Sequence, residues 1–170
     1  MLRLAVISLS LVTAVLLETA LFPFLTLVGF RPNLLLLLVV GVALSDGAMS
    51  GLRVGFAAGL LTDLMIHQAP VGLAALVFTG VGYVIGLARP YLAPDSLTAP
   101  ILLAFISGLL GTAGYGVLSI LLGDERVTGA LLVQASVSVA LYNTLLAPIV
   151  FGIVNRLSDR FPLQAASVLR

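Results

Sequence analysis

The sequence contains no cysteine, no lysine and only one histidine, His67. Without cysteine the chain can form no disulfide, use no thiol in catalysis and bind no metal through thiolates. Zinc sites use three or four protein ligands, and His67 can supply only one imidazole. Eight arginines balance seven acidic residues, which leaves a formal net charge of +1 and excludes a basic surface for nucleic acid. We therefore expect no metal, no cofactor and no nucleic-acid partner.

Charge of either sign is scarce. Charged residues make up 9% of the chain and hydrophobic residues 61%, whereas about 25% of an ordinary soluble domain is charged. The mean hydropathy is +1.23. A water-facing surface cannot be built from this composition, so we predict an integral membrane protein. Because one span needs roughly 20 apolar residues, the chain provides five or six helices in a single domain.

We expect an all-α polytopic membrane protein with six transmembrane helices. The first could be taken for a signal peptide, but its apolar run exceeds the usual 7 to 15 residues and lacks a clear cleavage site, so we expect it to be retained. The expected helices cover residues 4–22, 32–45, 47–66, 71–88, 97–122 and 128–154, and residues 155–170 form a cytoplasmic tail.

The second predicted helix is short. At 1.5 Å per residue, residues 32–45 cover roughly 21 Å of a hydrocarbon core of roughly 30 Å. This helix could cross a thin part of the bilayer, extend into the preceding connector, or form half of a re-entrant hairpin with the third helix. Merging the second and third helices would leave five spans.

The arginines favour six spans. With six spans, six arginines fall on the side of the two termini and two on the other side, and positive residues gather on the cytoplasmic side of membrane proteins. Both termini are therefore expected in the cytoplasm. The six are Arg3, Arg53, Arg89, Arg156, Arg160 and Arg170, and the two are Arg31 and Arg126.

Glycines recur every four residues in the third predicted helix, and small residues do so in the fifth. Such spacing places them on one helix face, where a neighbouring backbone can come close. Each glycine weakens a helix by about 1 kcal/mol relative to alanine, so tight packing, which small residues provide in lipid, must compensate. The predicted packing residues are Gly47, Gly51, Gly55, Gly59, Gly108 and Gly116.

Five polar side chains lie inside predicted helices or at their ends. Glu18 could bind a cation or a polar partner, or bond to a neighbouring helix. Asp46 could cap the third helix or take part in binding. Asp63 and His67 lie one turn apart and could form an acid–base or metal-binding pair, or a hydrogen-bonded helix end. Asn143 could hydrogen-bond across helices.

No catalytic or nucleotide-binding motif is present. The sequence lacks the GxSxG, HExxH, P-loop and dinucleotide-binding patterns. The repeated glycines lie along a helix, not in a loop, and so do not form a phosphate cradle. Since polar groups inside the helices are few, a passage for ions or sugars is also disfavoured. We predict a protein that is not an enzyme and that binds a protein partner or an apolar ligand.

The segment GLRVGFAAGLLTD, residues 51–63, resembles a pattern of the bacterial rod shape-determining protein MreD family. In that family a proline before the second helix precedes Gly-x-x-x-Gly-Phe-x-x-Gly-Leu-x-x-Asp, and a glycine opens the next helix. Here Pro23 and the run Arg31-Pro32-Asn33 precede the pattern. The matching residues are Gly51, Gly55, Phe56, Gly59, Leu60, Asp63 and Gly72.

The resemblance implies a non-catalytic scaffold of the cell-elongation complex in the bacterial inner membrane, required for rod shape and lateral peptidoglycan synthesis. It implies binding to MreC, a single-span protein, and possible contact with the MreB filament and with peptidoglycan synthases, namely a penicillin-binding protein and its glycosyltransferase partner. The family is also similar in fold to the substrate-binding subunits of energy-coupling-factor vitamin transporters. A small-molecule-binding transporter subunit is therefore the alternative.

A partner surface is expected near the glycine-rich helix. Our hypothesis is that Pro32, Phe56 and Asp63 shape a groove or outer face that receives a partner's transmembrane helix. The motivation is the combination of tightly packing glycines with few polar interior groups. The full set of partner candidates is Pro32, Asn33, Phe56, Leu60, Asp63 and Gly72.

Overall fold

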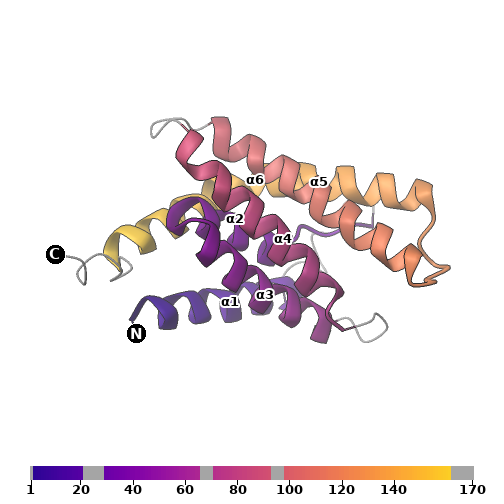
Figure 1. Ribbon diagram of the computed structural model, residues 1–170, viewed down its shortest axis with the longest axis horizontal. Coiled ribbons are helices and arrows are strands. Elements are labelled where there is room, and N and C mark those ends of the chain that lie inside the picture. The colour runs from indigo at the N-terminus through magenta and orange to yellow at the C-terminus, as the bar shows by residue number, and fades with distance from the viewer. Residues whose placement is uncertain (1, 21–28, 66–70, 93–97, 162–170) are drawn as a thin grey trace.

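The computed structural model describes residues 2–20, 29–65, 71–92 and 98–161, and its six α-helices confirm the all-α expectation (Figure 1). Three described segments are long and apolar enough to cross a membrane, namely α4 with the short helix after it, α5 and α6. Six spans therefore stay a prediction. The helices are α1 (Leu2–Ala20), α2 (Leu34–Asp46), α3 (Ala48–Met65), α4 (Leu73–Ala88), the 3-10 helix η2 (Arg89–Tyr91), α5 (Thr98–Leu121) and α6 (Gly129–Arg160).

Several helix ends differ from the expected ranges for local reasons. α2 begins at Leu34, not at residue 32, because Asn33 has a non-helical backbone and caps the helix. α3 and α4 begin just after Gly47 and Gly72, whose φ angles of 88° and 107° interrupt a right-handed helix. α6 continues to Arg160, so residues 155–160 extend a helix where a tail was expected. His67 and the end of the expected third helix lie outside the described residues.

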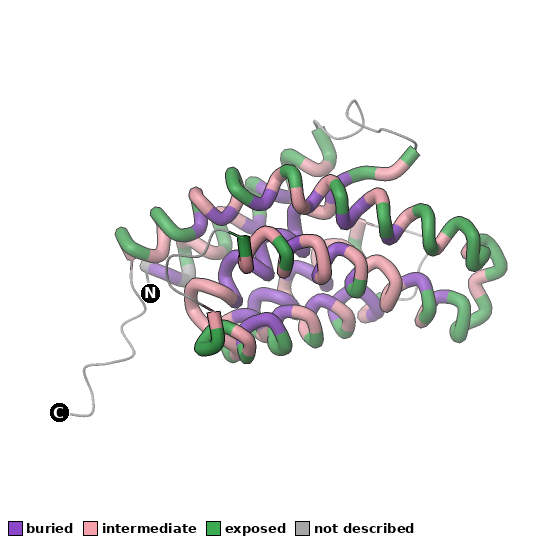
Figure 2. Tube along the Cα trace, turned by 90° about the horizontal axis from the view of Figure 1, so that it is seen from above, coloured by how far each residue is buried: buried purple, intermediate pink, exposed green. Residues whose placement is uncertain are grey.

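The short helix α2 forms the centre of the bundle. Every residue from Leu34 to Ala43 is buried, and α2 packs against each of the other five α-helices. Its apolar run is continuous around the helix, which is the pattern of a helix enclosed by protein on all sides. α2 is therefore a core helix covered by longer ones, and Figure 2 shows that buried segments, in purple, face the inside of the bundle.

Two antiparallel helix pairs surround α2. α3 packs along α4, and α5 packs along α6, which makes these the two most extensive helix contacts in the described part of the chain. α1 lies against α2 and touches α3 over a smaller area. Figure 1 shows α1 along one edge of the bundle and the α5–α6 pair along the opposite edge.

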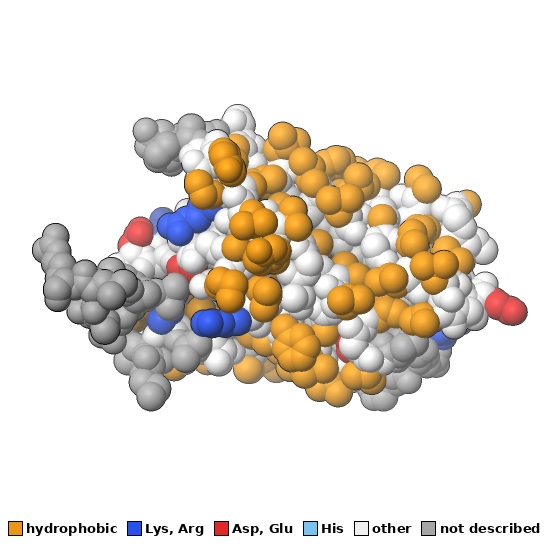
Figure 3. Space-filling view, in the orientation of Figure 1, with side chains coloured by type: hydrophobic (Ala, Val, Ile, Leu, Met, Phe, Trp, Pro, Cys, Tyr) orange, Lys and Arg blue, Asp and Glu red, His pale blue; other side chains and the backbone are white. Residues whose placement is uncertain are grey.

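The outer surface is apolar along the sides of the bundle. Large hydrophobic side chains such as Leu76 on α4, Leu102 on α5 and Leu145 on α6 are 64%, 58% and 74% exposed. On the face drawn in Figure 3, hydrophobic side chains cover the middle, whereas charged side chains lie toward the ends. This distribution suits a bundle whose sides contact lipid and whose ends contact water.

Candidate functional site

The first candidate site surrounds the buried start of α2. The backbone N–H of Leu35 donates to Oε1 of Glu18 on α1 at 3.0 Å, and that of Leu36 donates to Oδ1 of Asn33 at 2.8 Å. The N–H of Asn33 donates to Oδ1 of Asn143 on α6 at 3.0 Å. The first N–H groups of a helix have no partner within it, and leaving them unpaired inside a protein is costly. Side chains from two neighbouring helices therefore make a buried helix start possible.

The charge of Glu18 also suits this position. The start of a helix carries a partial positive charge, so a carboxylate there is favourable. Asn143 is fully buried, and its Nδ2 lacks a hydrogen-bond partner within the described part of the chain. The contribution of Asn143 to the start of α2 is therefore the hydrogen bond that its Oδ1 accepts from the backbone N–H of Asn33. Of the two possibilities left open for Glu18, the structure places the carboxylate in a bond to a neighbouring helix.

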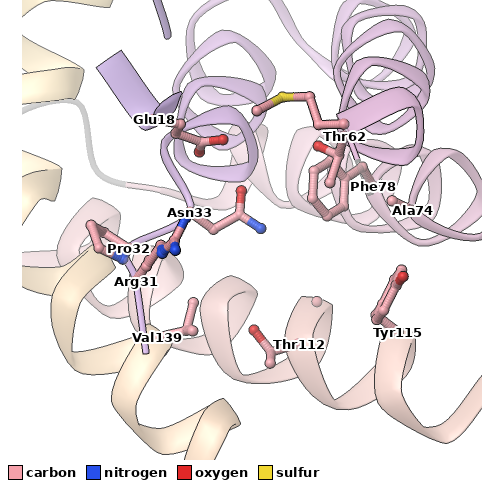
Figure 4. Close-up of a pocket in the computed structure, with 12 residues that line it drawn as sticks. Glu18, Arg31, Pro32, Asn33, Thr62, Ala74, Phe78, Thr112, Tyr115 and Val139 are labelled. Atoms are coloured by element: carbon pink, nitrogen blue, oxygen red, sulfur yellow. The ribbon is translucent and has the colours of Figure 1, made fainter. Parts of the chain in front are cut away.

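A cavity of about 250 Å³ lies beyond the start of α2. Figure 4 shows Thr112 and Tyr115, both on α5, on the opposite side of this cavity from Glu18 and Thr62. Within the described residues, no group of three or more His, Cys, Asp or Glu side chains could hold a metal ion. The cavity lining consists of Glu18, Arg31, Pro32, Asn33, Thr62, Met65, Ala74, Phe78, Gly111, Thr112, Tyr115 and Val139.

Asp63 holds the start of α4. The residue is 2% exposed, and its carboxylate accepts hydrogen bonds from the backbone N–H groups of Gly72 at 2.9 Å, Ala74 at 3.0 Å and Ala75 at 3.1 Å. Gly72 adopts the left-handed backbone conformation, with a φ of 107°. A Cβ at this position would meet no atom within 4 Å, so glycine suits the position because of its backbone conformation and not because a side chain would clash. Asp63 thus caps a helix from the neighbouring helix. His67, its expected companion, lies outside the described residues.

The glycines of α3 lie directly on the backbone of α4. A Cβ built on Gly51, Gly55 or Gly59 would come within 3.0 Å of backbone atoms of α4, closer than real Cβ atoms approach. Gly82 and Gly86 of α4 are equally close to the backbone at the start of α3. The two helices therefore touch backbone to backbone along several turns, which only residues without side chains allow.

The other predicted packing glycines have different surroundings. Gly47 precedes α3, and its φ of 88° makes it the turn between α2 and α3, although its carbonyl carbon does lie against Gly86. On α5, a Cβ on Gly108 would lie 2.9 Å from the Cα of Ala140 on α6. Gly116 makes room for the side chain of Leu132. α5 and α6 thus approach closely at Gly108 and interlock through a side chain at Gly116.

A second polar cluster joins three helix ends. Arg3 on α1 donates to Oδ2 of Asp46 at 3.0 Å from Nε and 2.6 Å from Nη2, and Ser158 on α6 donates to Oδ1 at 2.8 Å. Asp46 was expected to cap α3. That expectation is wrong, because the carboxylate binds these side chains instead of the backbone of α3. The start of α1 and the ends of α2 and α6 therefore meet at one end of the bundle.

The predicted partner residues are not all on the surface. Pro32 and Asp63 are buried, so their side chains cannot form an outer face of the isolated chain. Leu60 and Asn33 are half-buried, as is Gly72. Phe56 is 55% exposed and faces away from the packing glycines of α3. Among these candidates, Phe56 and Leu60 are the ones available for an apolar contact with a partner.

Sequence comparison assigns the chain to a family. The model of the rod shape-determining protein MreD family matches residues 1–157, which covers all six described helices except the last turn of α6. No curated protein and no solved structure matches the chain. The resemblance seen in the glycine-rich segment is confirmed, whereas the likeness to vitamin-transporter subunits stays a prediction. The chain belongs to the rod shape-determining protein MreD family.

Proposed function

We propose that this protein is a non-catalytic scaffold of the bacterial inner membrane that supports lateral peptidoglycan synthesis by binding an MreC-like single-span protein. Membership of the family indicates a role in rod shape determination. The apolar sides of the bundle support a location in the membrane. The start of α1 meets the end of α6 at one end of the bundle, which supports termini on one side. The arginine bias favours the cytoplasm for that side.

The observation that carries this proposal is how the enclosed acidic groups are used. Glu18 caps α2, Asp63 caps α4, and Asp46 pairs with Arg3. Each of these carboxylates is used to hold one helix to another, by a backbone cap or by an ion pair. The interior polar groups stabilise a rigid bundle, and the function then resides in the outer surfaces that this bundle presents.

We assign the partner helix to the outer face of α3. Phe56 and Leu60 lie there with Leu64, which is 62% exposed, and Met49, which is 58% exposed. The opposite face of α3 is held by its glycines against the backbone of α4. Exposed Arg53 lies between Met49 and Phe56 on this face, so the continuous apolar stripe is Phe56, Leu60 and Leu64. This stripe is available for van der Waals packing with a second transmembrane helix. The MreB filament and peptidoglycan synthases would join the complex through this partner or through the ends of the bundle.

Co-purification of the membrane complex tests this proposal. The double substitution Phe56→Ala and Leu60→Ala should leave the protein inserted and monodisperse but lower recovery of the single-span partner at least about tenfold, since large apolar contacts dominate interfaces. The matched control is Leu76→Ala with Val84→Ala, two exposed residues of α4. Equal recovery with both double variants would contradict the assignment, and rod shape in cells carrying the first variant would contradict its function.

A small-molecule-binding transporter subunit is the second candidate. The cavity of about 250 Å³ beside Glu18 and Arg31 favours it, because this cavity combines polar groups with apolar walls as ligand sites do. Mass spectrometry of the gently solubilised protein separates the two candidates. A stoichiometric metabolite together with co-purified ATPase subunits would favour the transporter, and recovery of the single-span partner without a metabolite would favour the scaffold.

A further inference from the structure

A groove of about 520 Å³ runs between α1 and α6, with α2 as its floor. α1 and α6 both lie on α2, but the two do not pack closely on each other, so the space between them stays open. The groove is distinct from the cavity at the start of α2. Its lining consists of Val6, Leu9, Ser10, Thr13, Ala14 and Leu17 from α1, Leu34 and Leu38 from α2, and Val150, Ile153, Val154, Leu157 and Phe161 at α6.

The groove is apolar even where its residues carry hydroxyls. The Oγ of Ser10 donates to the carbonyl oxygen of Val6 at 2.9 Å, and the Oγ1 of Thr13 donates to that of Leu9 at 2.8 Å. Both hydroxyls are therefore satisfied by the backbone of α1. The groove consequently offers hydrocarbon contact and does not call for a polar ligand along its length.

The length of the groove matches one leaflet of a bilayer. On α1 it extends over twelve residues, from Val6 to Leu17, a rise of about 16 Å along the helix. Half of a hydrocarbon core of roughly 30 Å is about 15 Å. Leu17 and Leu34, where α2 begins, lie at one end of the groove lining. A lipid acyl chain needs a groove of this length, whereas a helix that crosses the whole membrane needs one about twice as long.

Two arginines lie on the last turns of α6, beside the end of the groove where the start of α1 and the end of α6 meet. Ile153 and Leu157 line the groove, and Arg156 and Arg160 each follow one of them by three residues on α6. This spacing places both arginines beside the flank of the groove, although neither lines it. Both arginines are exposed, and neither forms an ion pair within the described residues. Asp159, also exposed, lies three residues after Arg156 and shares a face with it, but it is farther around the helix from the groove-lining residues than either arginine. Arg3, near the same end, is neutralised by Asp46.

We propose that this groove binds one anionic phospholipid, with an acyl chain between α1 and α6 and the phosphate at Arg156 and Arg160. The apolar groove selects hydrocarbon and the free guanidinium groups select a negative headgroup, because arginine binds phosphate through two parallel hydrogen bonds. Neither requirement alone would distinguish one lipid from the surrounding bilayer. The two requirements together, at one end of a groove that is one leaflet long, distinguish an anionic phospholipid from the other lipids.

Native mass spectrometry of the full chain tests the site, with phosphatidylglycerol and phosphatidylcholine of identical acyl chains as probes. The protein should retain one phosphatidylglycerol in preference to phosphatidylcholine. Because each basic group near a membrane surface contributes about fivefold, Arg156→Gln with Arg160→Gln should lower that preference by at least about tenfold. The matched control is Arg53→Gln with Arg89→Gln, exposed arginines on α3 and η2 near the same end of the bundle.

A second variant separates the groove from the arginines. Thr13 is exposed and lines the groove, so Thr13→Phe should fill it and reduce retention of both lipids without changing the arginines. Equal retention of the two lipids by the unmodified protein, or an unchanged preference in the arginine variant, would overturn the proposal. Displacement of the bound lipid by the purified single-span partner would assign the groove to a protein helix and would also overturn it.

Discussion

Arg3 and Asp46 lie 43 residues apart in the chain, and their side chains form a buried ion pair with two hydrogen bonds, at 2.6 and 3.0 Å. The side chains are 5% and 7% exposed. Ser158 on α6 donates to the second carboxylate oxygen, so this pair connects the start of α1 to the ends of α2 and α6. This cluster fixes the three helix ends relative to one another. No other polar contact in the described residues joins all three.

Removing one partner of this pair should destabilise the bundle. Asp46→Asn would leave the guanidinium of Arg3 buried without a counter-charge, which we expect to lower the free energy of unfolding by about 3 kcal/mol. Thermal unfolding in detergent would measure the change. The control is Arg126→Gln, which breaks the exposed pair with Asp124 in the α5–α6 turn and should change little. Equal unfolding temperatures for the two variants would contradict the structural role.

The glycine contact between α3 and α4 gives the sharpest comparison of matched substitutions. Gly55→Ala places a Cβ within 3.0 Å of the carbonyl of Phe78, and we expect a loss of at least about 1–3 kcal/mol as the helices are forced apart. Gly80→Ala is the control, since a Cβ there meets no atom within 4 Å and alanine is the better helix former by about 1 kcal/mol. In denaturation experiments in mixed micelles, the free energy of unfolding should be higher for Gly80→Ala than for the unmodified protein and lower for Gly55→Ala.

These two predictions also show what the sequence could and could not reveal. The four-residue spacing of Gly51, Gly55 and Gly59 is a local pattern that predicts one shared helix face, and in the structure all three lie against the backbone of α4. Pairing Arg3 with Asp46 required knowing which helix ends meet in space. An arginine and an aspartate far apart in the chain carry no signal of that kind. The sequence could therefore predict the faces of helices but not the long-range polar contacts between them.

The short second helix illustrates the same limit. Its apolar length is shorter than a hydrocarbon core, and the sequence leaves three alternatives, which are a thin span, an extension into the preceding connector or a re-entrant hairpin. The structure instead encloses α2 within the other helices. Its start is buried because Glu18 and Asn143, residues of α1 and α6, supply acceptors for the backbone. That solution depends on tertiary contacts, which the apolar pattern of α2 alone does not contain.

The position of Asp63 changes the effect expected of its substitution. The hypothesis that Asp63 shapes a surface for a partner helix implies that Asp63→Ala loses a partner contact alone. Because the carboxylate accepts three backbone N–H groups at the start of α4, its removal should leave buried donors unpaired and cost about 1–3 kcal/mol. Hydrogen exchange should become faster at Gly72, Ala74 and Ala75 before it changes at the start of α5. If the amides of Gly72, Ala74 and Ala75 exchanged at the same rate in Asp63→Ala as in an Asp159→Asn control, the capping role would be contradicted.

Glu18 allows a test between a cap and a cation site. If its carboxylate serves the start of α2, then Glu18→Gln keeps a hydrogen-bond acceptor and loses only the interaction with the helix dipole, up to about 1 kcal/mol. Glu18→Leu removes the acceptor as well and should cost about 1–3 kcal/mol because the N–H of Leu35 is left unpaired. Unfolding measured with and without added sodium or calcium distinguishes the roles. A cap predicts the same ranking at every cation concentration, whereas a cation site predicts that salt stabilises the unmodified protein and neither variant.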